Sequence, residues 1–484
     1  MVGSNATGAG NTAQAAVIVG TAVASSTDVR TYVPAASAAG GYVSYLRAIN
    51  TGTAATPVLV AKIDGSTGAL GASSQLTPSL PAGAAVTYSA QQVEAALGST
   101  LAAGDRPRIR VAGAIAPVEV QSLLLQPGGV FNEVSGAYSG SSVQVSTYVP
   151  AAASSSGYVS YLRVINTGSS ATAVTVARID PATGLTGTAG TLNPSLPAGA
   201  AITYSASQIE AALGTTIAAT ERPRIVVSGS TNLEVQSFLI QPGGAFTNIS
   251  TEQSGSSIDV RSYVPAAASG YTTYLRVVNA SGSATPITAT LMDDATGLAM
   301  ASGTLIASLP ANGAATLSST EVETAMATSI AAGSRPRIRI SSPGGTASLR
   351  TQSFLLQPGG AYNEMSNAIS GVSSNVRTYL PAADASGGYT SYLRVINPTA
   401  STTAVTIALI DGATGAVGSS RTLIAALPGG GAQTFSSSQI EAVLGTTIAA
   451  GSRPRIQVGG AVALEVQSFL TQPGGAFTEM SGAQ

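Results

Sequence analysis

The chain of 484 residues has no histidine, no cysteine and no tryptophan, and Lys62 is its single lysine. Without histidine it lacks the commonest general base and the commonest metal ligand, and Ser-His-Asp or Cys-His arrangements are impossible. Without cysteine it has no disulfides, no thiol chemistry and no thiolate ligands for metals. We therefore expect a protein that is not an enzyme and that uses no cofactor and no metal.

Charge of either sign is scarce as well. Charged residues make up 9% of the chain and the net charge is -1, whereas an average soluble protein has about 25% charged residues. Nucleic-acid binding needs a basic surface, so we expect no nucleic-acid partner. No apolar run reaches the ~18–20 residues of a membrane-spanning helix. At 44% hydrophobic residues the chain can bury a core, and a surface of Ser, Thr, Ala and Gly offers little repulsion between copies.

Three motifs each occur four times in the same order along the chain. They are Tyr-x-x-Tyr-Leu-Arg-x-x-Asn from Tyr42, Tyr158, Tyr271 and Tyr389; Arg-Pro-Arg-Ile from Arg106, Arg222, Arg335 and Arg453; and Gln-Pro-Gly-Gly from Gln126, Gln241, Gln357 and Gln472. The spacing predicts four tandem modules of about 115 residues. We place an N-terminal β-prone arm at 1–26 and the modules at 27–136, 137–252, 253–368 and 369–484.

Each module reads as short strands with one short helix. Alternating segments such as 173–179 have the period of two of a half-buried strand. A capping box, Ser89 with Gln92 in the first module, predicts a helix start, and Gly98, Gly214 and Gly445 predict its end. Ala327 stands at that place in module three, where we expect a looser end. Pro-Gly within Gln-Pro-Gly-Gly favours a type II turn.

Six to eight short strands per module predict an all-β fold of four Ig-like β-sandwiches, each with one short helix. About 115 residues are enough to close one such core. We expect the modules to follow one another as beads, joined by short linkers such as 135–142 and 250–257.

The order of these motifs resembles the Ig-like repeat modules of bacterial secreted and cell-surface proteins. The running order is Tyr-x-Arg-Val-Ile-Asn, an alternating strand ending near Asp, a Pro-Ala-Gly strand, a Ser-x-x-x-Ile-Glu helix and Val-Gln-Ser-Phe-Leu before a Pro-Gly hairpin, as in residues 161–244. The resemblance covers each module nearly end to end. It implies an extracellular or cell-surface location and a structural, stalk-like or adhesive role, and it supplies no catalytic residue.

Acidic residues recur once per module at two places. We interpret the acids of the Asp-x-x-Thr-Gly segments as turn caps, because a calcium site needs several oxygen ligands together. We interpret the helix glutamates as partners of the helix dipole, because no acid shows a repeated partner at glycosidase spacing. The first set is Asp64, Asp180, Asp293 with Asp294, and Asp411; the second is Glu94, Glu210, Glu323 and Glu441.

A tyrosine and an arginine share one strand face in every module. They could form a ligand-binding stripe for sugars, or the arginine stem could pack on the tyrosine with its head at a carbonyl or a carboxylate. Glu119, Glu234 and Glu465 are candidate partners, but module three has Arg350 at that place. The residues of the stripe are Tyr45, Arg47, Tyr161, Arg163, Tyr274, Arg276, Tyr392 and Arg394.

The N-terminal arm is apolar and β-prone although it precedes the first module. It could be a signal remnant, could pair within module one as 143–145 and 258–260 could in later modules, or could add a strand to a neighbouring subunit. The candidate assembly residues are Ala15, Ala16, Val17, Ile18, Val19 and Val23.

Together these features predict a structural subunit of a bacterial extracellular filament, sheath or surface layer. Its partner is itself, in a head-to-tail homopolymer held by β-strand edges between modules. The alternative is an adhesin stalk that binds a surface carbohydrate or matrix. In a chain with so few charges, contact between small uncharged side chains favours self-assembly.

Overall fold

Four β-sandwiches follow one another in the chain. The computed structural model describes residues 25–473 and 476–482. In module one, two antiparallel sheets have the strand orders β1-β6-β3-β4 and β5-β2-β7-β8. The elements of module one are β1 (Ser25–Val29), β2 (Val43–Asn50), β3 (Thr56–Ile63), β4 (Ser74–Leu80), β5 (Ala85–Ser89), α1 (Ala90–Leu97), β6 (Arg108–Gly113), β7 (Val118–Leu125) and β8 (Phe131–Glu133).

The later modules repeat this order. Module two has β9 (Tyr138–Val145), β10 (Val159–Asn166), β11 (Thr172–Ile179), β12 (Gly190–Leu196), β13 (Ala201–Ser205), α2 (Ala206–Leu213), β14 (Arg224–Ile240) and β15 (Phe246–Asn248). Module three has β16 (Gln253–Gly255), β17 (Ser257–Val260), β18 (Thr272–Asn279), β19 (Thr285–Met292), β20 (Ala299–Leu309), β21 (Ala314–Ser318), α3 (Ser319–Ala325), β22 (Arg337–Ser341), β23 (Leu349–Leu356) and β24 (Tyr362–Glu364). Module four has β25 (Ile369–Val376), β26 (Thr390–Ile396), β27 (Thr403–Ile410), β28 (Arg421–Leu427), β29 (Ala432–Ser436), α4 (Ser437–Leu444), β30 (Arg455–Thr471) and β31 (Phe477–Glu479).

Proline decides one difference between the modules. In modules two and four a single strand of 17 residues, β14 or β30, runs through both sheets. Module one has two strands there, β6 and β7, separated by a segment containing Pro117, and module three has β22 and β23 separated by a turn at Pro343. Proline cannot donate to a strand ladder, so it interrupts the long strand in these two modules.

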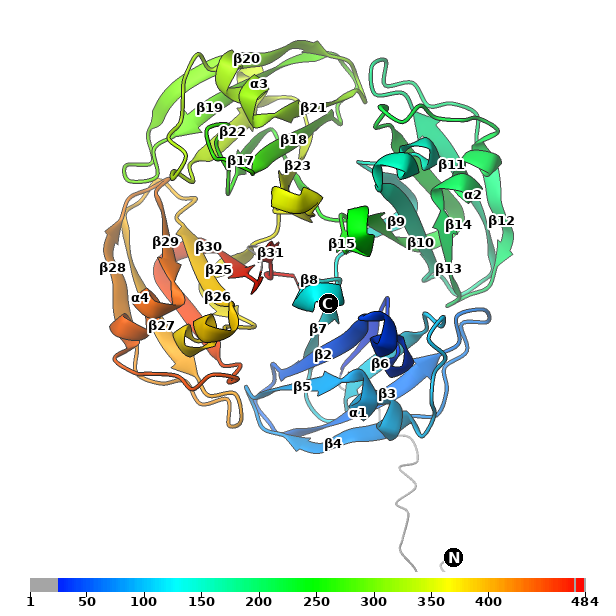
Figure 1. Cartoon of the computed structure of the whole chain (residues 1–484), viewed down its shortest axis with the longest axis vertical. Helices are drawn as coiled ribbons and strands as arrows, with labels where there is room; N and C mark the ends of the chain where they lie inside the picture. Colours follow the sequence, from blue (N-terminus) through cyan, green and yellow to red (C-terminus); the bar gives the residue numbers. More distant parts are fainter. Residues whose placement is uncertain (1–24, 474–475, 483–484) are drawn as a thin grey trace, which may run out of the picture.

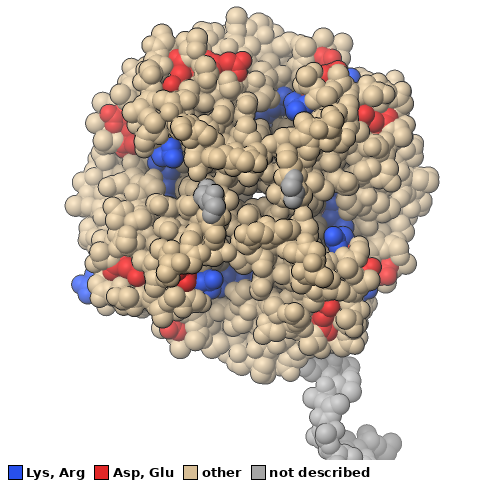
Figure 2. Space-filling view, viewed as in Figure 1, with Lys and Arg blue, Asp and Glu red and all other residues tan. Residues whose placement is uncertain are grey.

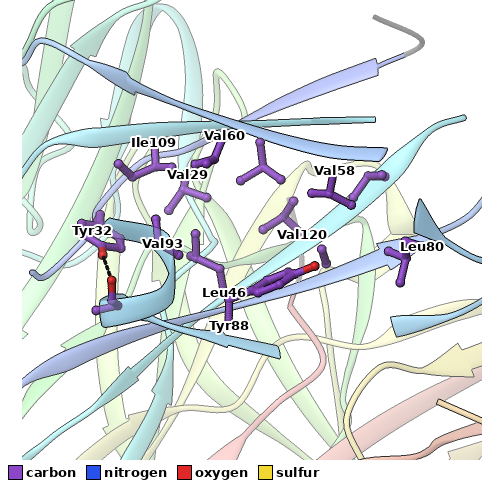
Figure 3. Close-up of a cluster of buried hydrophobic side chains, with 14 of the residues drawn as sticks. Val29, Tyr32, Leu46, Val58, Val60, Leu80, Tyr88, Val93, Ile109 and Val120 are labelled. Carbon is purple, nitrogen blue, oxygen red and sulfur yellow. Dashed lines mark hydrogen bonds between the residues drawn. The ribbon is translucent and has the colours of Figure 1, made fainter. Parts of the chain in front are cut away.

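Each module has its own apolar core between its two sheets. In module one, Val58 and Val60 of β3 point inward with Val29, Ile109 and Val93 of α1, as Figure 3 shows. The predicted alternation over 173–179 is confirmed, since Val174 and Val176 are fully buried. The sequence prediction of an all-β fold with four Ig-like sandwiches and one short helix in each is confirmed.

The helix and turn signals are confirmed as well. All four helices begin with a two-way capping box, and Gly98, Gly214 and Gly445 end theirs with φ of 65°, 63° and 67°. Module three differs as expected: α3 has 7 residues instead of 8, and Ala327 itself adopts φ of 50°. In the Gln126–Gly129 turn, Gly128 has φ 83° and ψ 5°, and Gly129 donates to the Gln126 carbonyl, as in a type II turn.

The four modules form a closed ring (Figure 1). Short strands at the end of each module, β8, β15, β24 and β31, meet around the central axis, and β31 contacts β8. The expectation of beads on linkers is therefore wrong: residues 138–142 already belong to β9, and module four packs against module one. We call the four contacts the 1/2, 2/3, 3/4 and 4/1 junctions, after the modules that meet there.

Candidate functional site

The glutamine of each Gln-Pro-Gly-Gly turn crosses a junction. Its side-chain amide accepts from a backbone N–H in the next module and donates to the carbonyl of the same residue, as a neighbouring strand would. The distances at Gln126 and Phe246 are 2.7 and 2.6 Å. The other pairs are Gln241 with Tyr362, Gln357 with Phe477, and Gln472 with Phe131. We call this pair of hydrogen bonds from one glutamine amide to one backbone residue the bracket. It occurs in all four junctions, including the one between modules four and one, and therefore closes the ring.

The arginines of the Tyr/Arg stripe are buried in the junctions. Arg163 is 3% exposed, and it donates to the carbonyls of Arg30 and Arg106 in the preceding module at 2.8 and 2.7 Å. Arg47 and Arg276 bind two such carbonyls, and Arg394 binds the Arg261 carbonyl and the Asp294 carboxylate. Burial lowers the pKa of Arg163 to about 9 and that of Arg47 and Arg276 to about 10.

The stripe is consequently not an open ligand face in this structure. Its tyrosines are half-buried and line the junctions; the ring of Tyr45 lies 5.8 Å from that of Phe131. The strand face that carries the tyrosines and arginines is closed because the neighbouring module covers it. Of the two interpretations left open by the sequence, the one with the arginine head at a carbonyl or carboxylate describes these contacts.

The candidate glutamate partners pair with a different arginine, across the junction. Arg30 binds Glu234 at 2.7 Å, Arg261 binds Glu465 at 2.7 Å, and Arg377 binds Glu119. At the 2/3 junction both positions differ: Ser146 replaces the arginine and Arg350 replaces the glutamate. Glu252 binds both of them, accepting from Ser146 and pairing with Arg350 at 3.0 Å. Arg350, the one departure from glutamate at this position, is thus compensated by Glu252, which supplies the missing negative charge.

The Asp-x-x-Thr-Gly turns fasten the outer part of each junction. Asp64 Oδ1 accepts from the Ser66 hydroxyl and from the backbone N–H groups of Thr67 and Ser66, and these bonds hold the pKa of the Asp64 carboxyl well below its usual range. The predicted turn-capping role is confirmed. The turn then docks on the next module, where Ala201 N donates to the Gly65 carbonyl at 2.8 Å. Asp294 differs, because its carboxylate binds Arg394 of module four.

The helix glutamates are internal acceptors, so the helix-dipole interpretation is wrong. Glu94 is buried and lies beyond the first turn of α1, where its Oε1 accepts from the Ala35 N–H at 2.7 Å and from the Tyr32 hydroxyl at 3.3 Å. Burial and the nearby Glu94 raise the pKa of Tyr32. Glu210, Glu323 and Glu441 make the same contacts in their modules. They tie the loop after the first strand to the helix.

Three glutamates lie near the ring axis, on β8, β24 and β31. Each accepts from the backbone of the serine two residues later at 2.7 Å: Glu133 from Ser135, Glu364 from Ser366 and Glu479 from Ser481. They line a cavity of about 20 Å³ together with Asn248, which stands at the same place in module two. Burial raises the pKa of Glu364 to about 8 and that of Glu479 to about 7; repulsion from Glu479 adds to the shift of Glu364, and repulsion from Glu133 adds to the shift of Glu479.

Larger cavities lie inside three junctions. Their volumes are about 380 Å³ at the 1/2 junction, 310 Å³ at the 3/4 junction and 230 Å³ at the 4/1 junction. Each is lined by a stripe tyrosine, Tyr161, Tyr392 or Tyr45, and by the first arginine of Arg-Pro-Arg-Ile from the other module. A repeated tyrosine and a repeated arginine are visible along the chain, but the cavity forms only where the two meet across a junction.

Within residues 25–473 and 476–482, no cluster of three or more acidic side chains is arranged to hold a metal ion. No helix in that part of the chain is long and apolar enough to cross a membrane. The candidate arm residues, Ala15, Ala16, Val17, Ile18, Val19 and Val23, lie outside the described residues. In module one, Thr27–Val29 of β1 occupies the place that Val143–Val145 of β9 holds in module two.

Comparisons with known proteins add little. No family model and no curated protein matches the chain. Among solved structures, one similar chain comes from work on the triple jelly-roll fold and turret assembly of an archaeal virus. It is 12% identical, and the match covers 70% of this chain and 86% of that chain with a TM-score of 0.15. A likeness at that score supports no conclusion about fold or function.

Proposed function

We propose that this protein is a structural subunit of a bacterial extracellular filament, sheath or surface layer, and that it is not an enzyme. The observation that carries the proposal is the use of the repeated polar residues. The glutamine of Gln-Pro-Gly-Gly, the stripe arginine and the Asp turn of each module hold that module to the next one. Residues that hold modules together build a rigid block, and the block is what the chain would contribute to an assembly.

Head-to-tail contacts run between modules of one chain here, so contacts between chains would form elsewhere. The outer rim carries the strands β4, β12, β20 and β28, each of which ends its sheet (Figure 1). Within the described residues, no strand pairs with their outer sides. An unpaired strand edge is a template for another strand.

Two of the four rim strands are better suited to pairing. β4 contains Pro78 and β12 contains Pro194, and proline on an edge blocks pairing. The same place holds Ala307 in β20 and Ala425 in β28. β20 is also the longest of the four, at 11 residues, and its Met300 is 64% exposed. We therefore assign β20 and β28 as the assembly edges.

The surface between these edges supports close approach of copies. Figure 2 shows a few separated acidic and basic groups on an otherwise uncharged face. With 9% charged residues and a net charge of -1, two copies repel one another weakly. Weak repulsion suits a subunit that packs against itself.

Electron microscopy of the purified protein tests the proposal. We expect regular fibres or sheets that the double variant Ala307→Pro/Ala425→Pro no longer forms. The two substitutions should be tolerated by the fold, because β4 and β12 carry proline at the same place and still pair with β3 and β11. The reverse variant Pro78→Ala/Pro194→Ala should assemble at a lower protein concentration.

Two outcomes would overturn the proposal. One is a wild-type protein that stays a monodisperse single ring at all concentrations in light scattering. The other is assembly that the Ala307→Pro/Ala425→Pro variant leaves unchanged while its melting temperature is also unchanged. The arm is tested separately by removing residues 1–24, since a donor-strand role for the arm requires that assembly stop in that deletion.

The alternative of a carbohydrate-binding adhesin relied on the Tyr/Arg stripe. Because Arg47, Arg163, Arg276 and Arg394 are buried and bonded to the neighbouring module, the stripe does not favour that role. A glycan array with the intact protein distinguishes the two proposals.

A further inference from the structure

The cavities of the 1/2 and 3/4 junctions have the size and the walls of small-molecule sites. Volumes of about 380 and 310 Å³ lie within the usual range of about 300–1,000 Å³ for such sites. The walls combine aromatic side chains with aliphatic and hydroxyl-bearing ones. In the 1/2 cavity Phe238 and Phe246 stack at 4.4 Å, and Phe469 and Phe477 stack at 5.0 Å in the 3/4 cavity. Their packed rings leave a flat apolar wall in each cavity.

Tyrosines complete the walls from both modules. Tyr161 and Tyr392 come from the same module as the stacked phenylalanines, and Tyr42 and Tyr271 come from the preceding module. The Tyr42 hydroxyl donates to the Gly244 carbonyl at 2.5 Å, which fixes its ring at the side of the 1/2 cavity. Aromatic walls held in this way prefer a flat, polarisable guest.

The 1/2 cavity is lined by Arg163, whose buried guanidinium is bonded to the carbonyls of Arg30 and Arg106. Each cavity also has one exposed arginine in its wall, Arg106 in the 1/2 cavity and Arg335 in the 3/4 cavity. Among the described residues, neither guanidinium has a carboxylate within ion-pair distance. The Arg106 side chain donates to the carbonyls of Ala103 and Asp105, and Arg335 donates to the Ser334 carbonyl. Loss of hydration lowers the pKa of both arginines, so an anion placed beside them would be stabilised.

We infer that each of these two cavities binds a small planar aromatic molecule with one anionic group, its ring against the phenylalanine pair and its anion at Arg106 or Arg335. The site needs two modules to be complete. It therefore exists only in the closed junction, and ligand binding stabilises the ring. This role is independent of assembly at the rim.

The other two junctions differ at the residues that this inference uses. At the 2/3 junction, Tyr362 replaces the second phenylalanine, and its ring lies 6.5 Å from Tyr158 and 6.1 Å from Tyr274. Among the described residues, no such ring contact joins Phe246 to Tyr42 or Tyr161. At the 4/1 junction, Leu123 stands where Phe238 does in module two, and Arg453 is paired with Asp384 at 3.0 Å.

Titration with 2-naphthoate, followed by calorimetry and by its fluorescence, tests the inference on the whole chain. We expect two molecules bound per chain. Phe246→Tyr and Phe477→Tyr should each remove one, because each copies the residue that module three has naturally. Tyr362→Phe should add a third, beside Arg222. Arg106→Gln and Arg335→Gln should each weaken binding at their own site about tenfold.

The neutral analogue 2-naphthalenemethanol separates the two parts of the site. It should bind about tenfold more weakly than 2-naphthoate to the wild type, and equally to the wild type and the arginine variants. Melting temperatures establish that each variant is folded. The inference is overturned if folded wild-type protein does not bind 2-naphthoate at millimolar concentration, or if the number of bound molecules is the same in the phenylalanine and tyrosine variants.

Discussion

Gln472 makes two hydrogen bonds to the backbone of Phe131, a residue 341 positions away. Its Oε1 accepts from the Phe131 N–H at 2.6 Å and its Nε2 donates to the Phe131 carbonyl at 3.0 Å. This contact joins module four to module one, the pair that no linker connects. The three equivalent contacts join modules that are consecutive in the chain. The 4/1 junction is thus held by non-covalent contacts between the two ends of the repeat.

Replacing Gln472 by leucine should open the ring at the 4/1 junction. The change removes three hydrogen bonds, two to the Phe131 backbone and one to the Thr478 hydroxyl. It leaves the half-buried N–H and carbonyl of Phe131 without partners, which costs about 1–3 kcal/mol for each group. Urea unfolding should show a loss of about 2–4 kcal/mol, and small-angle X-ray scattering should show a larger radius of gyration. Gln75→Leu, at an exposed position of β4, is the control. Equal stability of the two variants would contradict the role of the bracket.

The exchanged charges at the 2/3 junction should be separable by mutation. Arg350→Glu places a second carboxylate beside Glu252 in a half-buried site, and we expect a loss of about 2–4 kcal/mol. The triple variant Ser146→Arg/Glu252→Ala/Arg350→Glu gives this junction the residues of the others, as at Arg30, Ala137 and Glu234. It should regain most of the lost stability in urea unfolding. A triple variant no more stable than Arg350→Glu alone would refute the exchange.

Stability should fall as pH rises through neutrality. The folded protein raises the pKa of Glu364 to about 8 and of Glu479 to about 7, with burial as the main cause, and it also raises that of Glu133. These acids hold protons that the unfolded chain releases above its ordinary glutamate pKa of about 4.3. Their contribution is therefore complete below that value and is lost as pH approaches 8.

Melting curves between pH 5 and pH 9 measure this effect. Glu364→Gln and Glu479→Gln should each flatten the dependence, because a neutral amide needs no proton. The difference in stability at pH 9 should approach about 1.4 kcal/mol for each unit by which the pKa was raised. Asn248 already supplies a neutral side chain at this place in module two. Glu321→Gln is the control, since its exposed capping position holds glutamine in the other three modules. An unchanged slope in Glu364→Gln would show that the axis does not titrate.

Ala327→Gly should stabilise module three. Ala327 has φ of 50°, in the left-handed region that favours glycine, and the other modules have glycine there. Removing the side chain relieves this strain by about 1 kcal/mol, minus the entropy that glycine adds to the unfolded chain. Thermal unfolding measures the gain. Ala211→Gly, at an exposed position inside α2, should instead lose about 1 kcal/mol.

Local signals in the sequence predicted much of each module correctly. Ser89 with Gln92 forms the expected capping box, Gly98 ends the helix, and Gly128 takes the positive φ of a type II turn. These predictions succeed because each depends on a few adjacent residues and on backbone geometry. Glu94 was misinterpreted because its partners, Tyr32 and Ala35, lie about 60 residues away.

The sequence by itself determined the number of modules, their all-β fold and the position of their turns and helices, since these follow from repetition and from neighbouring side chains. The tertiary structure alone decided that the modules close a ring. That outcome depends on the angle at which one sandwich meets the next, summed over four junctions, and no spacing along the chain encodes an angle. The same closure buries Arg163 against Arg106 and pairs Gln472 with Phe131. The repeated arginine and glutamine are visible in the sequence, but their partners belong to another module and become neighbours only when the ring is complete.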